Sequence, residues 1–254
     1  MSAVTIRRQR VEWVVAADRS HLHELAANVI LDVLRNTERP VFGFATGGTP
    51  LGLYEQLVRR SLENPRLLTR WQDVTGFNLD EYVGLSPEHP QSYHHYMWRY
   101  VYRYLPVRPD RMFIPKGIGN LEDNCRSYDE SLMKYGWPDV QILGIGKNGH
   151  IGFNEPARRL AMNTHVTRLS ESTRLANARF FPSARDVPEQ AITMGMAGIL
   201  RAKQIVLLAF GEAKRDALIR AFSGWLGTDV PASLLQLHPH VTVFTDQDIF
   251  GDLS

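Results

Sequence analysis

Short apolar runs alternate with longer amphipathic segments along most of this 254-residue chain. The amphipathic segment at residues 21–36, for example, repeats its apolar side chains at helical spacing. The apolar runs have the length of buried strands and comprise residues 41–45, 74–79, 140–146, 204–211 and 241–246. Because strands that alternate with helices favour parallel pairing, the sequence predicts an α/β fold. We expect a mainly parallel sheet with helices on both faces, in a modified Rossmann-like arrangement.

The rest of the chain fits one such domain, which we expect to span residues 1–254. No internal repeat, low-complexity tract or Gly/Ser-rich linker interrupts it. A further strand is predicted at residues 164–169. The other predicted helices cover residues 51–64, part of 86–105, 123–136, 192–202 and 212–224.

Composition excludes several classes of partner. With 29 basic and 27 acidic residues, the net charge of +2 gives no reason to expect nucleic acid or an anionic membrane surface. No segment approaches the roughly 20 apolar residues of a membrane-spanning helix, and the early arginines precede no apolar core of a signal peptide. The single cysteine, Cys125, suits a reducing compartment. We therefore expect a cytoplasmic protein.

Four predicted strands end in polar or glycine-rich sequence: TGGTP, NLDEY, GKNGHIGFNE and FGEAK. In open α/β sheets, ligands bind beyond the carboxyl ends of the strands. We therefore expect the functional site at this edge of the sheet.

The stretch TGGTP joins a strand to a helix. Gly47 and Gly48 allow the backbone to approach a ligand closely, and a helix N-terminus favours an anion such as phosphate. Thr46 and Thr49 add hydroxyl groups. The alternative is a tight turn that needs its glycines only for geometry. The spacing and the lack of a following Lys exclude a Walker A loop.

Two adjacent carboxylates, Asp80 and Glu81, follow the second strand. Neighbouring side chains of a strand point to opposite faces, so at most one of them faces a given pocket. A carboxylate at a strand end can act as a general base. The alternative is a solvated turn or a helix cap.

The loop at residues 144–156, GIGKNGHIGFNEP, opens with a literal G-x-G-x-x-G. No amphipathic helix follows it, so the dinucleotide-binding interpretation fails. What remains is a polar cluster of Asn148, His150, Asn154 and Glu155. Histidine is suited to moving protons near neutral pH, and a neighbouring group can orient it. The alternative is a structural loop that bonds its own backbone. Since H-E-x-x-H and Cys/His clusters are both missing, we expect no metal.

The motifs ATGGTP, FNLDEYVGL, GIGKNGHIGFNEP, STRLANARFF and LQLHP resemble, in this order, the glucosamine-6-phosphate deaminase family. The resemblance extends from about Phe42 to the C-terminus. The related 6-phosphogluconolactonases share the fold and a similar glycine–histidine loop. They differ after the histidine, where FNEP is typical of the deaminases.

The resemblance implies a cofactor-free acid–base reaction that converts an amino sugar phosphate to fructose 6-phosphate and ammonia. Asp80 would move the C2 proton of the opened sugar to C1. His150 would catalyse ring opening, and Glu155 would support its proton transfer.

The same resemblance implies a phosphate site. Thr46, Gly47, Gly48 and Thr49 would line this site, and two cations would supply charge to it. These cations are Arg179, expected on a mobile lid at residues 169–190, and Lys214.

The chain departs from the family pattern at two places. Asn148 stands where the best-known deaminases have Asp, and an amide brings no charge to the histidine. Regulated deaminases carry an Arg-x-Lys pair after FNEP, whereas this chain has His165-Val166-Thr167. We therefore expect little or no activation by N-acetylglucosamine 6-phosphate.

Several alternatives stay open. The substrate could be galactosamine 6-phosphate, because the motifs do not reveal the C4 stereochemistry. A 6-phosphogluconolactonase, or a sugar-phosphate sensor without catalysis, is more distant. Related enzymes range from monomers to hexamers, so a homo-oligomer is also open.

Overall fold

An eight-stranded sheet organises the chain in the computed structural model, which describes residues 3–8 and 10–247. The strands follow the order β1-β2-β11-β10-β7-β3-β4-β6. All neighbouring pairs are parallel except β1 and β2, which are antiparallel. The prediction of a mainly parallel sheet is thus confirmed. The strand bounds are β1 Val4–Arg8, β2 Val11–Val15, β3 Val41–Phe44, β4 Thr75–Asn78, β6 Met112–Phe113, β7 Val140–Gly144, β10 Gln204–Ala209 and β11 Val241–Thr245.

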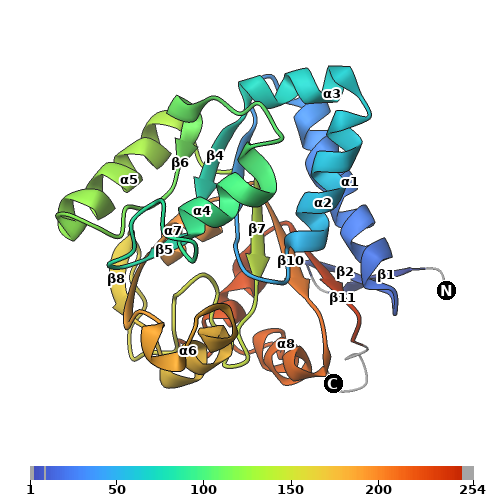
Figure 1. Cartoon of the computed structure of the whole chain (residues 1–254). Helices are drawn as coiled ribbons and strands as arrows, with labels where there is room; N and C mark the ends of the chain where they lie inside the picture. Colours follow the sequence, from blue (N-terminus) through green and yellow to red (C-terminus); the bar gives the residue numbers. More distant parts are fainter. Residues whose placement is uncertain (1–2, 9, 248–254) are drawn as a thin grey trace.

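The chain leaves the two central strands in opposite directions. From β3 it proceeds to β4 and β6 at one edge, and from the adjacent β7 it proceeds to β10 and β11 toward the other edge. Right-handed crossovers therefore place the helices of the two halves on opposite faces. Figure 1 shows α1, α2 and α3 on one side of the strands and α5 on the other. The helix bounds are α1 Arg19–Asn36, α2 Leu51–Leu62, α3 Pro65–Arg70, α4 Tyr93–Met97, α5 Leu121–Tyr135, α6 Glu171–Asn177, α7 Met196–Leu200 and α8 Arg215–Ala221.

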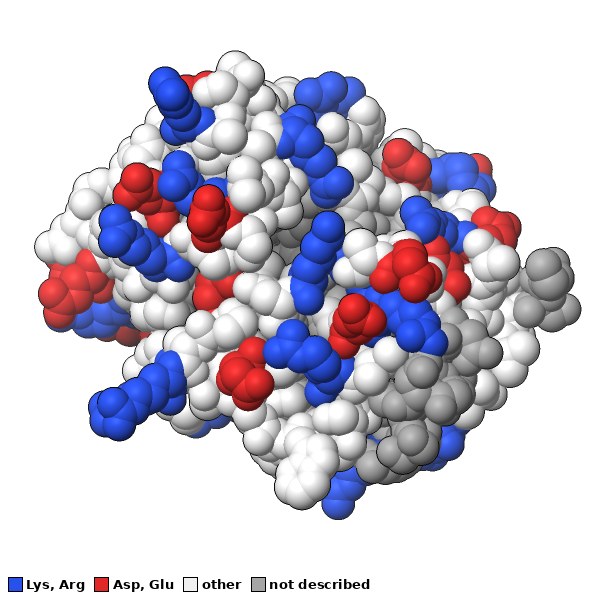
Figure 2. All heavy atoms as spheres, turned by 90° about the horizontal axis from the view of Figure 1, so that it is seen from below, with Lys and Arg blue, Asp and Glu red and all other residues white. Residues whose placement is uncertain are grey.

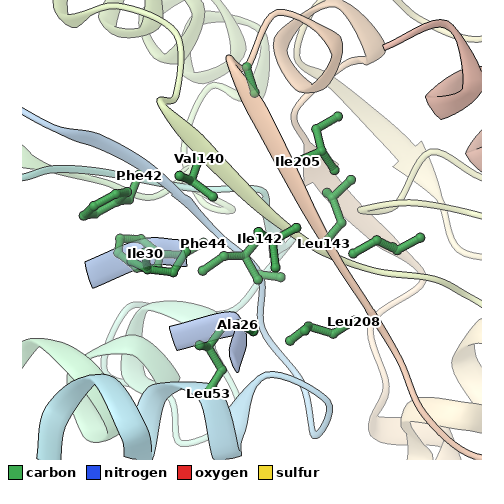
Figure 3. Packing of buried hydrophobic residues seen from close by; sticks show 14 of the residues in the cluster. Ala26, Ile30, Phe42, Phe44, Leu53, Val140, Ile142, Leu143, Ile205 and Leu208 are labelled. Atoms are coloured by element: carbon green, nitrogen blue, oxygen red, sulfur yellow. The ribbon is translucent and has the colours of Figure 1, made fainter. Parts of the chain in front are cut away.

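The core lies where these central strands meet the helices. Phe42 and Phe44 of β3 are fully buried, as are Ile142 of β7 and Ile30 of α1. Figure 3 shows these side chains packed together. Each contributes roughly 1.5–3 kcal/mol through its burial, so β3 and β7 provide a rigid base for the loops at their ends.

A second, three-stranded sheet has the order β5-β9-β8 and is antiparallel. It consists of β5 Asp80–Tyr82, β8 His165–Arg168 and β9 Gln190–Thr193. Asp80 is the first residue of β5 and pairs with Thr193 of β9. This small sheet fixes Asp80 immediately beyond the end of β4.

Two parts of the fold differ from the sequence-based expectation. The helix predicted over residues 192–202 is wrong at its start, because Ile192 and Thr193 belong to β9 and the helix covers only Met196–Leu200. The antiparallel pair β1–β2 was not expected at all. No helix among the described residues is long and apolar enough to span a membrane.

Candidate active site

A cavity of about 920 Å³ lies at the carboxyl ends of β3 and β7, where the chain direction diverges. This is the switch point at which open α/β sheets bind ligands. The predicted site residues line the cavity except for two members of the polar cluster, Asn154 and Glu155, and Glu155 lies behind it. Figure 2 views the molecule from below and shows Lys and Arg side chains around a central hollow.

One end of the cavity is built to accept an anion. Gly47 has a φ of 94°, a conformation that favours glycine, and α2 begins shortly afterwards at Leu51. Thr46, Gly48 and Thr49 line the cavity beside it. The N-terminus of α2 therefore directs its positive dipole end toward this loop.

Two cations reach the same end from other elements. Arg179 lies in the 3₁₀ turn η4, Ala178–Phe180, and its Nη2 is 3.7 Å from where a Cβ on Gly48 would lie. Lys214 donates through Nζ to the carbonyl of Ile145 at 2.5 Å. Burial, together with the positive charges of Lys147 and Arg179, lowers the pKa of Lys214. An anionic ligand would relieve this repulsion, so the cluster fits phosphate.

Asp80 faces the cavity although its side chain is almost fully buried. Burial raises the pKa of its carboxyl to about 8, and the neighbouring Glu81 contributes to the increase. No described side chain or backbone N–H stabilises the ionised form by a hydrogen bond. Asp80 is therefore a strong base once it is deprotonated.

Glu81 points away from the cavity, as the strand geometry predicted. Its carboxylate accepts hydrogen bonds from the backbone N–H groups of Tyr82, Tyr93 and His94, at 2.8–2.9 Å. Burial nevertheless raises the pKa of Glu81 to about 7, against the opposing effect of these donors. Its role is to attach α4 to β5.

A relay of three side chains occupies the loop after β7. Oδ1 of Asn148 lies 2.7 Å from Nδ1 of His150, and Nδ2 of Asn148 donates to Oε2 of Glu155 at 2.7 Å. The same Oε2 is 3.5 Å from Nδ1 of His150. Asn148 thus accepts from the imidazole and donates to the carboxylate, which an Asp could not do in its ionised form.

Glu155 is strongly held in its ionised form. Burial alone would raise its pKa, but the hydrogen bond and charge of His150, followed by the donors Thr173 and Asn148, lower it to about 2. Glu155 does not line the cavity and acts on it only through His150. The polar cluster of the loop therefore combines a histidine suited to proton transfer with a partly buried anion behind it.

Asn154, the remaining member of the polar cluster, has a structural position. It is buried, and its Nδ2 donates to the carbonyls of Ile151 and Met194. These bonds attach the loop to the end of β9. The alternative of a structural role thus applies to Asn154 alone.

Sequence reasoning missed several cavity residues. His23 of α1 contacts the carbonyl of Thr49 through Nε2 at 3.1 Å, and Arg19 lines the cavity beside it. Thr173, in α6, donates to Oε1 of Glu155 at 2.5 Å. Nothing in the sequence pattern distinguishes His23 and Arg19 from ordinary surface residues. Thr173 stands in the recognised stretch STRLANARFF, which was the one available signal.

Within residues 3–8 and 10–247, no group of three or more His, Cys, Asp or Glu side chains is arranged to hold a metal ion. The side chains that line the cavity include a carboxylate, a histidine and several cations. Asp80 and His150 are the lining groups suited to proton transfer, and the loop beside α2 is suited to bind an anion.

Comparisons with known proteins agree with this geometry. Residues 17–244 match the family of glucosamine-6-phosphate isomerases and 6-phosphogluconolactonases. A glucosamine-6-phosphate deaminase of Geobacillus sp. is 45% identical over 239 residues, which cover 94% of each chain. Glucosamine-6-phosphate deaminase 1 of Bacillus subtilis is 45% identical over 229 residues, which cover 89% of this chain and 93% of the relative.

Solved structures give the same result for the fold. A monomeric glucosamine-6-phosphate deaminase superposes with a TM-score of 0.89 at 42% identity, covering 96% of this chain and 99% of the other. A 6-phosphogluconolactonase of Thermotoga maritima, at 17% identity, has a TM-score of 0.72, covering 92% of this chain and 98% of the other, and shares the fold alone. The chain therefore belongs to the family of glucosamine-6-phosphate isomerases and 6-phosphogluconolactonases.

Proposed function

We propose that this protein is an enzyme that converts glucosamine 6-phosphate to fructose 6-phosphate and ammonia. The observation that carries the proposal is the placement of three parts in one cavity: the buried base Asp80, the His150–Asn148–Glu155 relay, and a cationic loop for phosphate. The relatives with 45% identity are named for this activity.

The phosphate group would anchor the substrate far from the reacting carbons. The loop of residues 46–49, Arg179 and Lys214 hold the charge, and this fixed point orients the sugar toward Asp80 and His150. Binding energy from this remote group is thereby used to position C1 and C2.

Ring opening comes first, because the hydrogen on C2 is acidic only while C1 is a carbonyl. His150 moves a proton from the anomeric hydroxyl to the ring oxygen as the C1–O5 bond breaks. The ionised Glu155 stabilises the imidazolium that forms during this transfer. A general acid–base step of this kind contributes roughly 10²–10⁴-fold.

Asp80 carries out the isomerisation. The ionised carboxylate takes the C2 proton while the C2 ammonium of the substrate gives one proton to O1, which yields an enolamine. The carboxyl group then returns the C2 proton to C1. The resulting C2 imine adds water and releases ammonia, leaving the ketone of fructose 6-phosphate. Every proton is accounted for, and no redox step occurs. We propose that no cofactor takes part.

One chain by itself supplies the carboxylate, the histidine and the cations that line this cavity. A relative with 42% identity is described as monomeric, which favours a monomer over a homo-oligomer. We propose that residues 169–190 form a lid over the cavity, since α6 and η4 of this segment carry Thr173 and Arg179. The reducing environment that suits the single cysteine supports a cytoplasmic setting.

The test is ammonia release from glucosamine 6-phosphate and, in parallel, from galactosamine 6-phosphate, with Asp80→Asn as the control. We expect turnover of the gluco epimer and its loss in the variant. Turnover of the galacto epimer alone would reassign the substrate. Should neither sugar release ammonia, deamination is refuted, and hydrolysis of 6-phosphogluconolactone becomes the reaction to measure.

A further inference from the structure

The carboxylate of Glu155 is held from two sides by different parts of the chain. Asn148, in the same loop, donates to Oε2, the oxygen nearest His150. Oε1 accepts from the lid helix α6 instead, through Thr173 Oγ1 at 2.5 Å and Ser170 Oγ at 3.2 Å. Each oxygen of Glu155 therefore has its own hydrogen-bond donors.

The donors on Oε1 decide how the carboxylate is turned. Rotation about the last side-chain bond of Glu is broad and nearly two-fold. Without the donors on Oε1, the bond from Asn148 to Oε2 would remain, and the carboxylate could turn about it away from His150. With Thr173 in place, Oε2 is directed toward Nδ1 of His150 at 3.5 Å. The side chain of Thr173 thus helps to set the distance between Oε2 of Glu155 and Nδ1 of His150.

Thr173 is itself rigidly placed. It is 4% exposed, and its backbone N–H donates to Oγ of Ser170, the N-cap of α6. A β-branched side chain in a helix has few available rotamers. Its hydroxyl also lies 3.5 Å from Nδ1 of His150, so it borders both members of the pair. Arg179 follows α6 directly in η4, so one lid segment contacts both the anion site and the relay.

We propose that Thr173 is a positioning residue that orients Glu155 toward His150 and so couples the lid to the ring-opening step. The inference rests on the proposed function, because it assigns Thr173 to that reaction. Thr173 acts through Glu155 and contributes no proton to the sugar.

The test compares Thr173→Val, which keeps the shape and removes the hydroxyl, with Thr173→Ser, which restores it. Thr167→Val, in β8, is the matched control because its hydroxyl makes no bond to Glu155. We expect Thr173→Val to lower kcat by about 10-fold or more, the effect of losing a hydrogen bond to a charged group, with KM nearly unchanged. Thr173→Ser and the control should retain most of the activity.

A second measurement does not depend on turnover. The ring resonances of His150, assigned by their loss in His150→Asn, should shift in Thr173→Val and stay in place in Thr173→Ser and Thr167→Val. Equal losses of kcat in the Val and Ser variants, or unmoved ring resonances in Thr173→Val, would overturn the assignment. Wild-type protein that releases no ammonia would refute the proposed function, while the resonances would still decide the role of Thr173.

Discussion

Two carboxylates at or behind the same cavity lie in opposite electrostatic environments. Asp80, at the start of β5, accepts no hydrogen bond from the residues that the structure describes, and burial raises its pKa to about 8. Glu155, in the loop after β7, is partly buried, but His150, Thr173 and Asn148 lower its pKa to about 2. Burial acts in the same direction on both acids. The difference therefore comes from the hydrogen bonds and the interaction with His150 at Glu155, and from the neighbouring Glu81 at Asp80.

This contrast supports the roles that we propose for the two acids. A carboxylate with a high pKa and no donors takes a proton from carbon effectively once it is ionised. One with a low pKa remains an anion and stabilises a neighbouring imidazolium. The two environments therefore fit proton transfer at C2 and ring opening, respectively.

Replacing Asp80 should have the largest effect on the reaction. Asp80→Asn removes the base and keeps the shape, so kcat should fall by about 10²–10⁴-fold. The measurement is ammonia release under saturating substrate, with Asp73→Asn, an exposed acid in a 3₁₀ turn, as the control. A variant that retained more than a tenth of the activity would show that Asp80 is not the base.

The pH profile should report the ionisation of Asp80 in the free enzyme. Because its pKa is raised to about 8, kcat/KM should rise with pH and change about tenfold per unit below that value. Glu81→Gln removes the negative charge next to Asp80 and should move the rising part of the kcat/KM profile to lower pH. A profile that is flat between pH 6 and 8 would contradict the assignment.

Asn148→Asp should change the profile with a smaller loss of rate. An Asp at this position cannot donate to Oε2 of Glu155, so two carboxylates would meet where Asn148 Nδ2 now lies 2.7 Å from Oε2. The pair would share a proton and titrate at higher pH. We expect kcat within about tenfold of wild type. We also expect the pH at which the rate profile rises or falls to shift. An unshifted limb would mean that Asn148 does not control the relay.

The smallest effects should be those on thermal stability. The changes in Tm caused by Asp80→Asn and Glu155→Gln should have opposite signs. The folded state favours protonated Asp80, so the destabilisation caused by this group develops as pH rises from about 4 toward 8. Asp80→Asn should therefore raise the Tm by a few degrees at pH 8 and by less at pH 5.

Glu155 has the reverse sign. Its lowered pKa stabilises the folded state above about pH 4.5, and this contribution is lost as pH falls toward 2. Glu155→Gln should lower the Tm by a few degrees at both pH 5 and pH 8. The measurement is thermal unfolding of both variants and the wild type at pH 5 and pH 8, which checks both predicted changes in Tm. Tm changes of equal size and the same sign in the two variants would contradict the opposite electrostatic environments of Asp80 and Glu155.

Much of the fold and site could be predicted because the signals were local. The runs ending in TGGTP and GIGKNGH contain both a buried strand and the loop that follows it, and β3 and β7 are neighbours in the sheet. Parallel strands bring their carboxyl ends to one edge. Thr46, Asp80 and His150 therefore line one cavity as the sequence predicted.

What could not be predicted depends on contacts between distant segments. Ile192 lies in an apolar run that suits a helix equally well, and only its pairing with Glu81 and Val166 makes it a strand residue. Thr173, in α6, reaches Glu155 in the loop after β7, which is 18 positions earlier in the chain. The opposed pKa shifts of Asp80 and Glu155 likewise arise from burial and from hydrogen-bond donors, which no local pattern encodes.

The most direct test of the central claim is to titrate both carboxyl groups in the free enzyme. Carbon-13 NMR of labelled Asp and Glu side chains can follow them, with Asp80→Asn and Glu155→Gln used for assignment. The account predicts that the Asp80 carboxyl titrates near pH 8 while Glu155 stays ionised throughout the range from pH 5 to 9. If both carboxyl groups are already ionised at pH 5, the contrast between the two acids is wrong.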